Sequence, residues 1–179
     1  MTVDRISSSD TQGAASSTDL VWDGLFTGMI GALIVALWFF VLDLVQGRPF
    51  YTPALLGTVL LHGGAAAASG PIVAPLEVAA YTAFHFLSFL VVGYVLSWLM
   101  TLFERFPIVF FVILVVFVSL QFGFFAINVA LGAELLGHLS AWSVVVANVL
   151  AAAGMAFYQW RQHPDALAKV ERLWADDAQ

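Results

Sequence analysis

Long apolar runs separated by short polar stretches dominate the chain. Four runs are long enough to cross the hydrocarbon core of a bilayer, which is about 30 Å thick and needs about 20 residues of helix. They cover approximately residues 20–45, 72–100, 107–131 and 140–160. Backbone groups in lipid must be bonded within a helix or a closed barrel, and the ten-residue alternation typical of barrel strands does not occur. The pattern therefore predicts an all-α membrane protein with four transmembrane helices in an up-down bundle.

One further apolar stretch, residues 53–62, covers less than three helical turns and is too short to span. Thr52 and Pro53 form a typical helix start, with the hydroxyl as cap and proline at the first helical position. Gly63 and Gly64 form a typical stop. We expect a short interfacial or re-entrant helix between the first two spans.

The two ends of the chain differ from the apolar part, residues 19–163. Residues 1–18 are rich in Ser, Asp and Gly, have no apolar centre, and are expected to be a disordered tail. This order of residues does not fit a cleaved signal peptide, so the first span is expected to be retained. Pro164 ends the last span, and residues 164–179 are expected to be an amphipathic tail at the membrane surface.

Composition agrees with a membrane protein, since 61% of the residues are hydrophobic, 10% are charged and the mean hydropathy is +0.94. Soluble domains have about half apolar and about a quarter charged residues. The bilayer is thus the expected partner. The net charge of −6 is concentrated in the tails, and nothing in the sequence suggests nucleic-acid binding. The absence of cysteine excludes thiol chemistry and iron–sulfur ligation.

Small and amide residues predict where helices pack. A stripe of small residues in the first span and another in the fourth would let helices approach closely, while amides in the third and fourth spans would bond across helix interfaces. These packing residues are Gly24, Gly28, Ala32, Gln121, Asn128, Ala147, Asn148 and Ala151. The same faces could also pack against another membrane protein or a second copy.

Basic residues predict the orientation. With four spans, both tails and the turn at Arg105 share one side, which carries five of the six basic residues, while the other side has only Arg48. By the positive-inside rule, both termini are cytoplasmic in an inner membrane.

This topology gathers most polar side chains of the spans and connectors at the opposite side. The candidate ligand or proton site comprises Asp43, His62, Glu77, Tyr81, His85, Glu134 and His138. Asp43 could equally end its span at the headgroups, and His85 could simply bond a neighbouring helix.

Three functions remain open from these residues. Histidines and carboxylates at one bundle end could hold a transition metal, or haem through His85 with His62 or His138. Small-solute or proton transport is a second alternative, although the tail-side halves of the spans show almost no ionisable residue. The sequence has no His-x-x-x-His or Glu-x-x-His spacing and no repeated ligand pair that would support a metal site. It also has no catalytic motif, so an enzyme is disfavoured. A structural or accessory membrane role is the preferred prediction.

Overall fold

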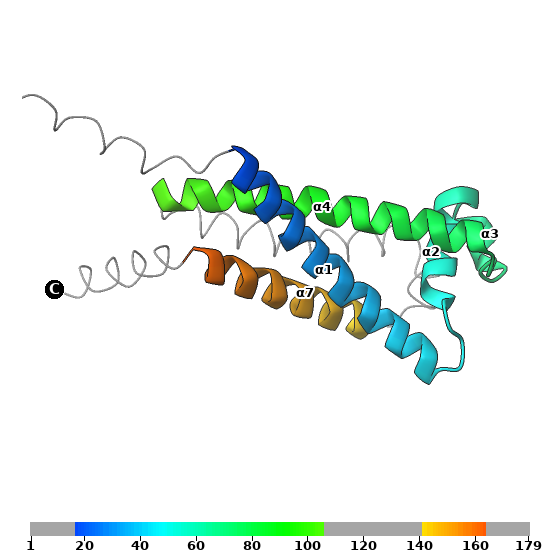
Figure 1. Cartoon of the computed structure of the whole chain (residues 1–179). Coiled ribbons are helices and arrows are strands. Elements are labelled where there is room, and N and C mark those ends of the chain that lie inside the picture. The colour runs from blue at the N-terminus through cyan, green and yellow to red at the C-terminus, as the bar shows by residue number, and fades with distance from the viewer. Residues whose placement is uncertain (1–16, 106–140, 164–179) are drawn as a thin grey trace, which may run out of the picture.

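The computed structural model describes residues 17–105 and 141–163, and these residues are helical without any strand. The described helices are α1 (Ser17–Val45), α2 (Tyr51–His62), α3 (Gly64–Ala68), α4 (Pro75–Arg105) and α7 (Ala141–Gln162) (Figure 1). Three of them are long and apolar enough to cross a membrane, namely Thr18–Val45, Pro75–Leu102 and Trp142–Gln162. The all-α prediction is confirmed for this part of the chain. The predicted third span, 107–131, and both tails lie outside the described residues, apart from the start of α1.

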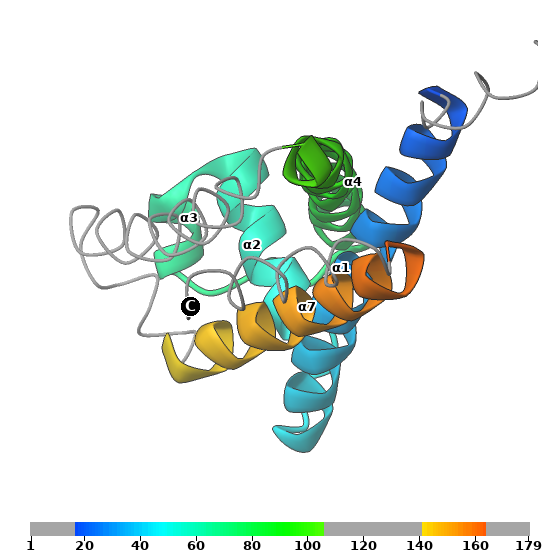
Figure 2. The same ribbon diagram turned by 90° about the vertical axis from the view of Figure 1, so that its left-hand side faces the viewer.

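Helix α1 lies between α4 and α7 and packs against both (Figures 1 and 2). It runs opposite to α4, because Gly24 lies against Tyr94 near the end of α4 and Gly28 against Phe89. It also runs opposite to α7, because Trp38 Nε1 donates to the carbonyl of Ser143 at 3.0 Å. Helices α4 and α7 therefore run in the same direction.

The contact between α1 and α4 depends on glycines in both helices. A Cβ on Gly28 would lie 2.5 Å from the Phe89 carbonyl oxygen and 2.8 Å from the Leu90 Cα. A Cβ on Gly93 would likewise meet the backbone of Gly24 and Gly28. Small residues permit such close approach in lipid, where packing and hydrogen bonds replace the hydrophobic drive. The predicted stripe therefore packs inside the chain, against α4.

The contact between α1 and α7 forms a small apolar core. Val35 of α1 is buried with Ala147 and Ala151 of α7, and Ala32 is also buried. Asn148 is half-buried beside them on α7. The second predicted small-residue face therefore also packs within the chain. Gln121 and Asn128 lie outside the described residues.

Helices α2 and α3 lie at one end of the bundle, here called the loop end, where α1 ends and α4 begins (Figure 1). The opposite end, where α1 begins and α4 and α7 end, is called the tail end. Helix α2 packs against α4 so closely that a Cβ on Gly57 would overlap the backbone of Glu77. The short α2 was predicted at residues 53–62 and is found at Tyr51–His62, whereas α3 was not predicted.

Candidate functional site

At the loop end, Asp43 organises the turn from α1 into α2. The backbone N–H and the hydroxyl of Thr52 donate to its two carboxylate oxygens at 2.7 and 2.8 Å, and the Asp43 carbonyl accepts from the backbone N–H of Arg48 at 2.9 Å. Gly47 (φ 68°) and Phe50 (φ 64°) adopt the left-handed conformation that this reversal needs. A carboxylate at a helix N-terminus accepts hydrogen bonds from free N–H groups and interacts favourably with the positive end of the helix dipole. Asp43 therefore caps α2 from the neighbouring helix α1.

This geometry corrects the predicted helix start. The Thr52 hydroxyl was expected to cap α2, but α2 already begins at Tyr51 and the hydroxyl donates to Asp43 instead. Local sequence showed a good cap residue but could not show that a carboxylate nine positions earlier supplies the capping oxygen. Asp43 is buried with both oxygens bonded, which makes it a structural residue in this arrangement.

His62 and Glu77 form an ion pair that ties the end of α2 to the first turn of α4. His62 Nε2 lies 3.1 Å from Glu77 Oε1. Glu77 is only 5% exposed and its Oε2 has no hydrogen-bond partner, whereas the His62 side chain is 41% exposed. A second bond joins α2 to the segment before α4, because the backbone N–H of Ile72 donates to the Thr58 hydroxyl at 2.9 Å. Two of the predicted site residues thus meet, and their contact fastens α2 to α4.

His85 lies deeper in the bundle and bonds to α1. Its Nε2 lies 3.1 Å from the carbonyl oxygen of Ala32, and since a carbonyl only accepts, Nε2 carries the proton and donates. The rings of Tyr81 and Phe89 lie beside the imidazole, with centroids 5.7 and 4.9 Å away. His85 therefore makes the interhelical bond that was one of its two predicted roles.

The predicted site residues do not converge on one point in the described part of the chain. Asp43 bonds to the start of α2, His62 to Glu77, and His85 to Ala32. Within residues 17–105 and 141–163, no group of three or more His, Asp or Glu side chains is arranged to hold a metal ion. The other two predicted site residues, Glu134 and His138, lie outside this part of the chain.

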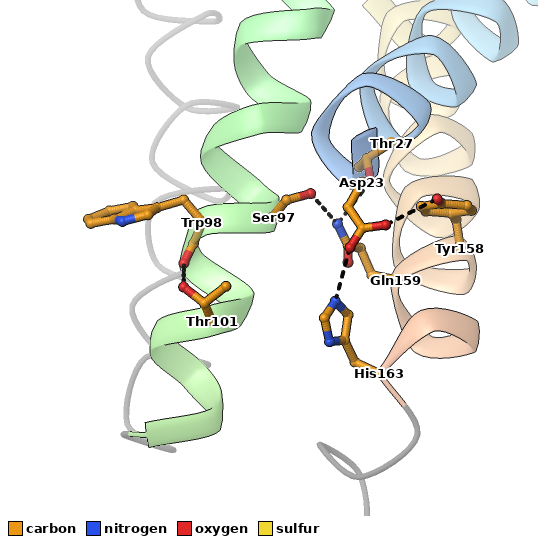
Figure 3. A network of polar contacts seen from close by, with 8 residues as sticks. All are labelled: Asp23, Thr27, Ser97, Trp98, Thr101, Tyr158, Gln159 and His163. Carbon is orange, nitrogen blue, oxygen red and sulfur yellow. Dashed lines mark hydrogen bonds and ion pairs between the residues drawn. The ribbon is translucent and has the colours of Figure 1, made fainter. Parts of the chain in front are cut away.

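The structure contains a second polar cluster, at the tail end, that was not predicted. We call it the three-helix junction and define it as Asp23, Thr27, Ser97, Tyr158, Gln159 and His163 (Figure 3). It joins α1, α4 and α7. Asp23 lies in the tail-side half of the first span, and His163 directly follows the end of α7.

Gln159 connects the three helices of this junction. Its Nε2 donates to the Thr27 hydroxyl on α1 at 2.9 Å and to the Ser97 hydroxyl on α4 at 2.7 Å (Figure 3). Both amide protons are thus used. Its Oε1 is buried without a partner, and the residue as a whole is 5% exposed.

Asp23 has only long contacts. The Tyr158 hydroxyl donates to its Oδ1 at 3.4 Å, and His163 Nε2 lies 3.8 Å from its Oδ2. Its side chain is 26% exposed. Spacing could have indicated this cluster, because Asp23 and Thr27 are one helical turn apart, as are Gln159 and His163. The lateral pairing of α1 with α7 could not be read from spacing.

Comparison with known proteins gives no further assignment. No family model, curated protein or solved structure matches this chain.

Proposed function

We propose that this chain is a four-span membrane protein with a structural or accessory role rather than a catalytic one. The observation that carries this proposal is how the polar side chains are used. In the described helices they bond mainly to neighbouring helices, at the Asp43 turn, the His62–Glu77 pair, the His85–Ala32 bond and the three-helix junction. Such bonds are the expected means of holding helices together in lipid.

Exposed aromatic residues support the membrane placement. Trp142 and Trp160 lie near the two ends of α7, and Trp22 and Phe40 lie near the two ends of α1. Each pair is separated by about 27 Å of helix at 1.5 Å per residue, close to the roughly 30 Å hydrocarbon thickness. Between these aromatic residues, the outward faces of α1 and α4 carry large exposed apolar side chains, among them Leu33, Leu37, Val91 and Val92.

Helix direction supports a fourth span. Helix α4 ends at the tail end, and α7 begins toward the loop end and runs in the same direction (Figure 1). A fourth span in the apolar run 107–131, which is long enough to cross a bilayer as a helix, would link these two ends.

Basic residues support cytoplasmic termini. Arg105 ends α4 and Arg161 lies in the last turn of α7, both at the tail end, while Arg48 is in the turn at the loop end. By the positive-inside rule the tail end faces the cytoplasm, with the protein in an inner (cytoplasmic) membrane.

A membrane partner would use a face that the chain itself leaves uncovered. The small-residue stripes of α1 and α7 pack internally, so they are occupied. The outward apolar faces of α1 and α4 remain for lipid, for a second copy or for another membrane protein.

Purification of the full-length protein in mild detergent tests this proposal. An accessory role predicts a colourless protein without stoichiometric transition metal, and a partner membrane protein that is recovered after crosslinking in native membranes. A Soret band or one equivalent of zinc, copper or iron, lost in His85→Ala or His62→Ala, would instead establish the ligand-binding alternative. Trp38→Phe, which keeps all histidines, is the matched control for effects of altered packing.

A further inference from the structure

One buried hydrogen-bond acceptor of the three-helix junction has no donor among the described residues. Gln159 uses both amide protons on hydroxyl groups, and its Oε1 stays buried and unpartnered. An unpaired buried carbonyl costs about 1 to 3 kcal/mol in proteins, so a donor or a cation is expected beside it.

The charge of the junction points to a cation. Asp23 brings a formal negative charge, and its contacts to Tyr158 and His163 are long, at 3.4 and 3.8 Å. The nearest arginine of α7, Arg161, lies over the ring of Phe157 with its guanidinium carbon 5.0 Å from the centroid. Among the described residues, no lysine or arginine forms an ion pair with Asp23. Asp23 lies beside Trp22 near the tail end of α1, and its partly buried carboxylate favours a nearby positive charge.

The donor atoms match a hard cation. The carboxylate of Asp23 and the carbonyl of Gln159 are oxygen ligands, which hard cations prefer over nitrogen and sulfur, and the Tyr158 hydroxyl lies beside the carboxylate. In Figure 3 the side chains of Asp23 and Gln159 extend from α1 and α7 into the same region between the helices. Because Asp23 is 26% exposed, a cation could enter from the tail end.

We propose that the three-helix junction is a binding site for a small monovalent metal cation of the sodium class, held by Asp23 and the buried carbonyl of Gln159. The hydroxyls of Thr27 and Ser97 fix the Gln159 amide so that its oxygen is presented to the cation. A site of this kind goes beyond a structural or accessory role, because occupancy of the site couples the packing of α1, α4 and α7 to ion concentration.

Thermal unfolding of the full-length protein in detergent, followed by tryptophan fluorescence, tests the site. NaCl is titrated against choline chloride at constant ionic strength, with KCl as a third series. We expect a saturable rise in melting temperature with Na⁺ that choline does not produce. Identical melting curves in NaCl and choline chloride would overturn the proposal, and would indicate that a water molecule satisfies Gln159 instead.

Variants locate the effect. Asp23→Asn keeps the shape of the side chain and should raise the half-saturating Na⁺ concentration at least tenfold. Asp19→Asn removes the same charge one turn away on the exposed side of α1 and should leave the titration unchanged. A Na⁺ response that is the same in Asp23→Asn as in the wild type would overturn the proposal. Line broadening of the ²³Na NMR signal by wild-type protein, and its loss in Asp23→Asn, gives a second readout that does not depend on folding stability.

Discussion

Replacing Gly28 by alanine tests whether close approach of α1 and α4 holds the bundle together. The added methyl group would lie 2.5 Å from the Phe89 carbonyl oxygen and 2.8 Å from the Leu90 Cα. Both are backbone atoms, so no side chain can rotate away. The two helices must separate by up to roughly 1 Å to reach ordinary van der Waals distance.

Two opposing effects set the size of the change. A gap of 0.5 to 1 Å forfeits about a quarter to a half of each dispersion contact across the interface, and overpacking in tight cores costs about 1 to 3 kcal/mol. The same movement stretches the His85–Ala32 bond, which is 3.1 Å long and one turn away along α1. Alanine is favoured over glycine within a helix by about 1 kcal/mol, which offsets part of the loss. We expect a net destabilisation of about 1 to 2 kcal/mol.

The assay is unfolding of the full-length protein in detergent, by heat or by titration with a denaturing detergent. Gly64→Ala is the matched control, because a Cβ there meets no atom within 4 Å and Gly64 lies in α3, away from the α1–α4 contact. It should be neutral or slightly stabilising. If Gly28→Ala were as stable as Gly64→Ala, the close glycine contact would not be a determinant of the fold, and the reasoning from backbone distances would be refuted.

Three further variants test the other contacts. Asp43→Asn should lower the free energy of unfolding by about 1 to 3 kcal/mol and speed backbone amide hydrogen exchange in the first turn of α2, because the charged cap of α2 is lost; unchanged exchange there would contradict the capping role. Trp38→Phe should cost about 1 kcal/mol, measured by the same unfolding assay, because it removes the bond to a backbone carbonyl of α7; equal stability would show that this bond contributes nothing. His62→Ala should destabilise by leaving a buried carboxylate unpaired, and adding Glu77→Gln should restore part of the loss; a double variant less stable than His62→Ala would argue against a pair interaction.

Sequence alone predicted the helices well because their signals are local. The apolar length and the breaks at glycine and proline located α1, α4, α7 and the short α2 to within a few residues. The small-residue stripes also indicated real packing faces. Which helix covers each face was not predictable, because periodicity describes one helix at a time and contains no information on its neighbour.

The positions of the polar residues relative to one another were also not predictable from the sequence. Grouping by topology put Asp43, His62, Glu77 and His85 on one side as a common site, but topology fixes only depth along the bundle and not lateral position. In the structure these side chains bond to different partners on different helices. The sequence did not indicate a role for Gln159, because a single amide near the end of a span resembles an ordinary interfacial residue. Its role depends on Thr27 and Ser97, which lie on two other helices.

The distribution of polar contacts along the bundle indicates how the fold is stabilised. In lipid there is no hydrophobic drive between helices, so association must come from packing and hydrogen bonds. The three-helix junction at the tail end joins all three long helices, and the loop end is closed by α2 through Asp43 and the His62–Glu77 pair. Between them the contacts depend on glycine packing, on the apolar core of α1 and α7, and on the His85–Ala32 and Trp38–Ser143 bonds. Because separate polar contacts hold the two ends of the bundle, helix packing can change at one end while the contacts at the other end stay in place. The junction, where a buried acceptor and a carboxylate lack close partners, is therefore where a ligand would alter the packing most.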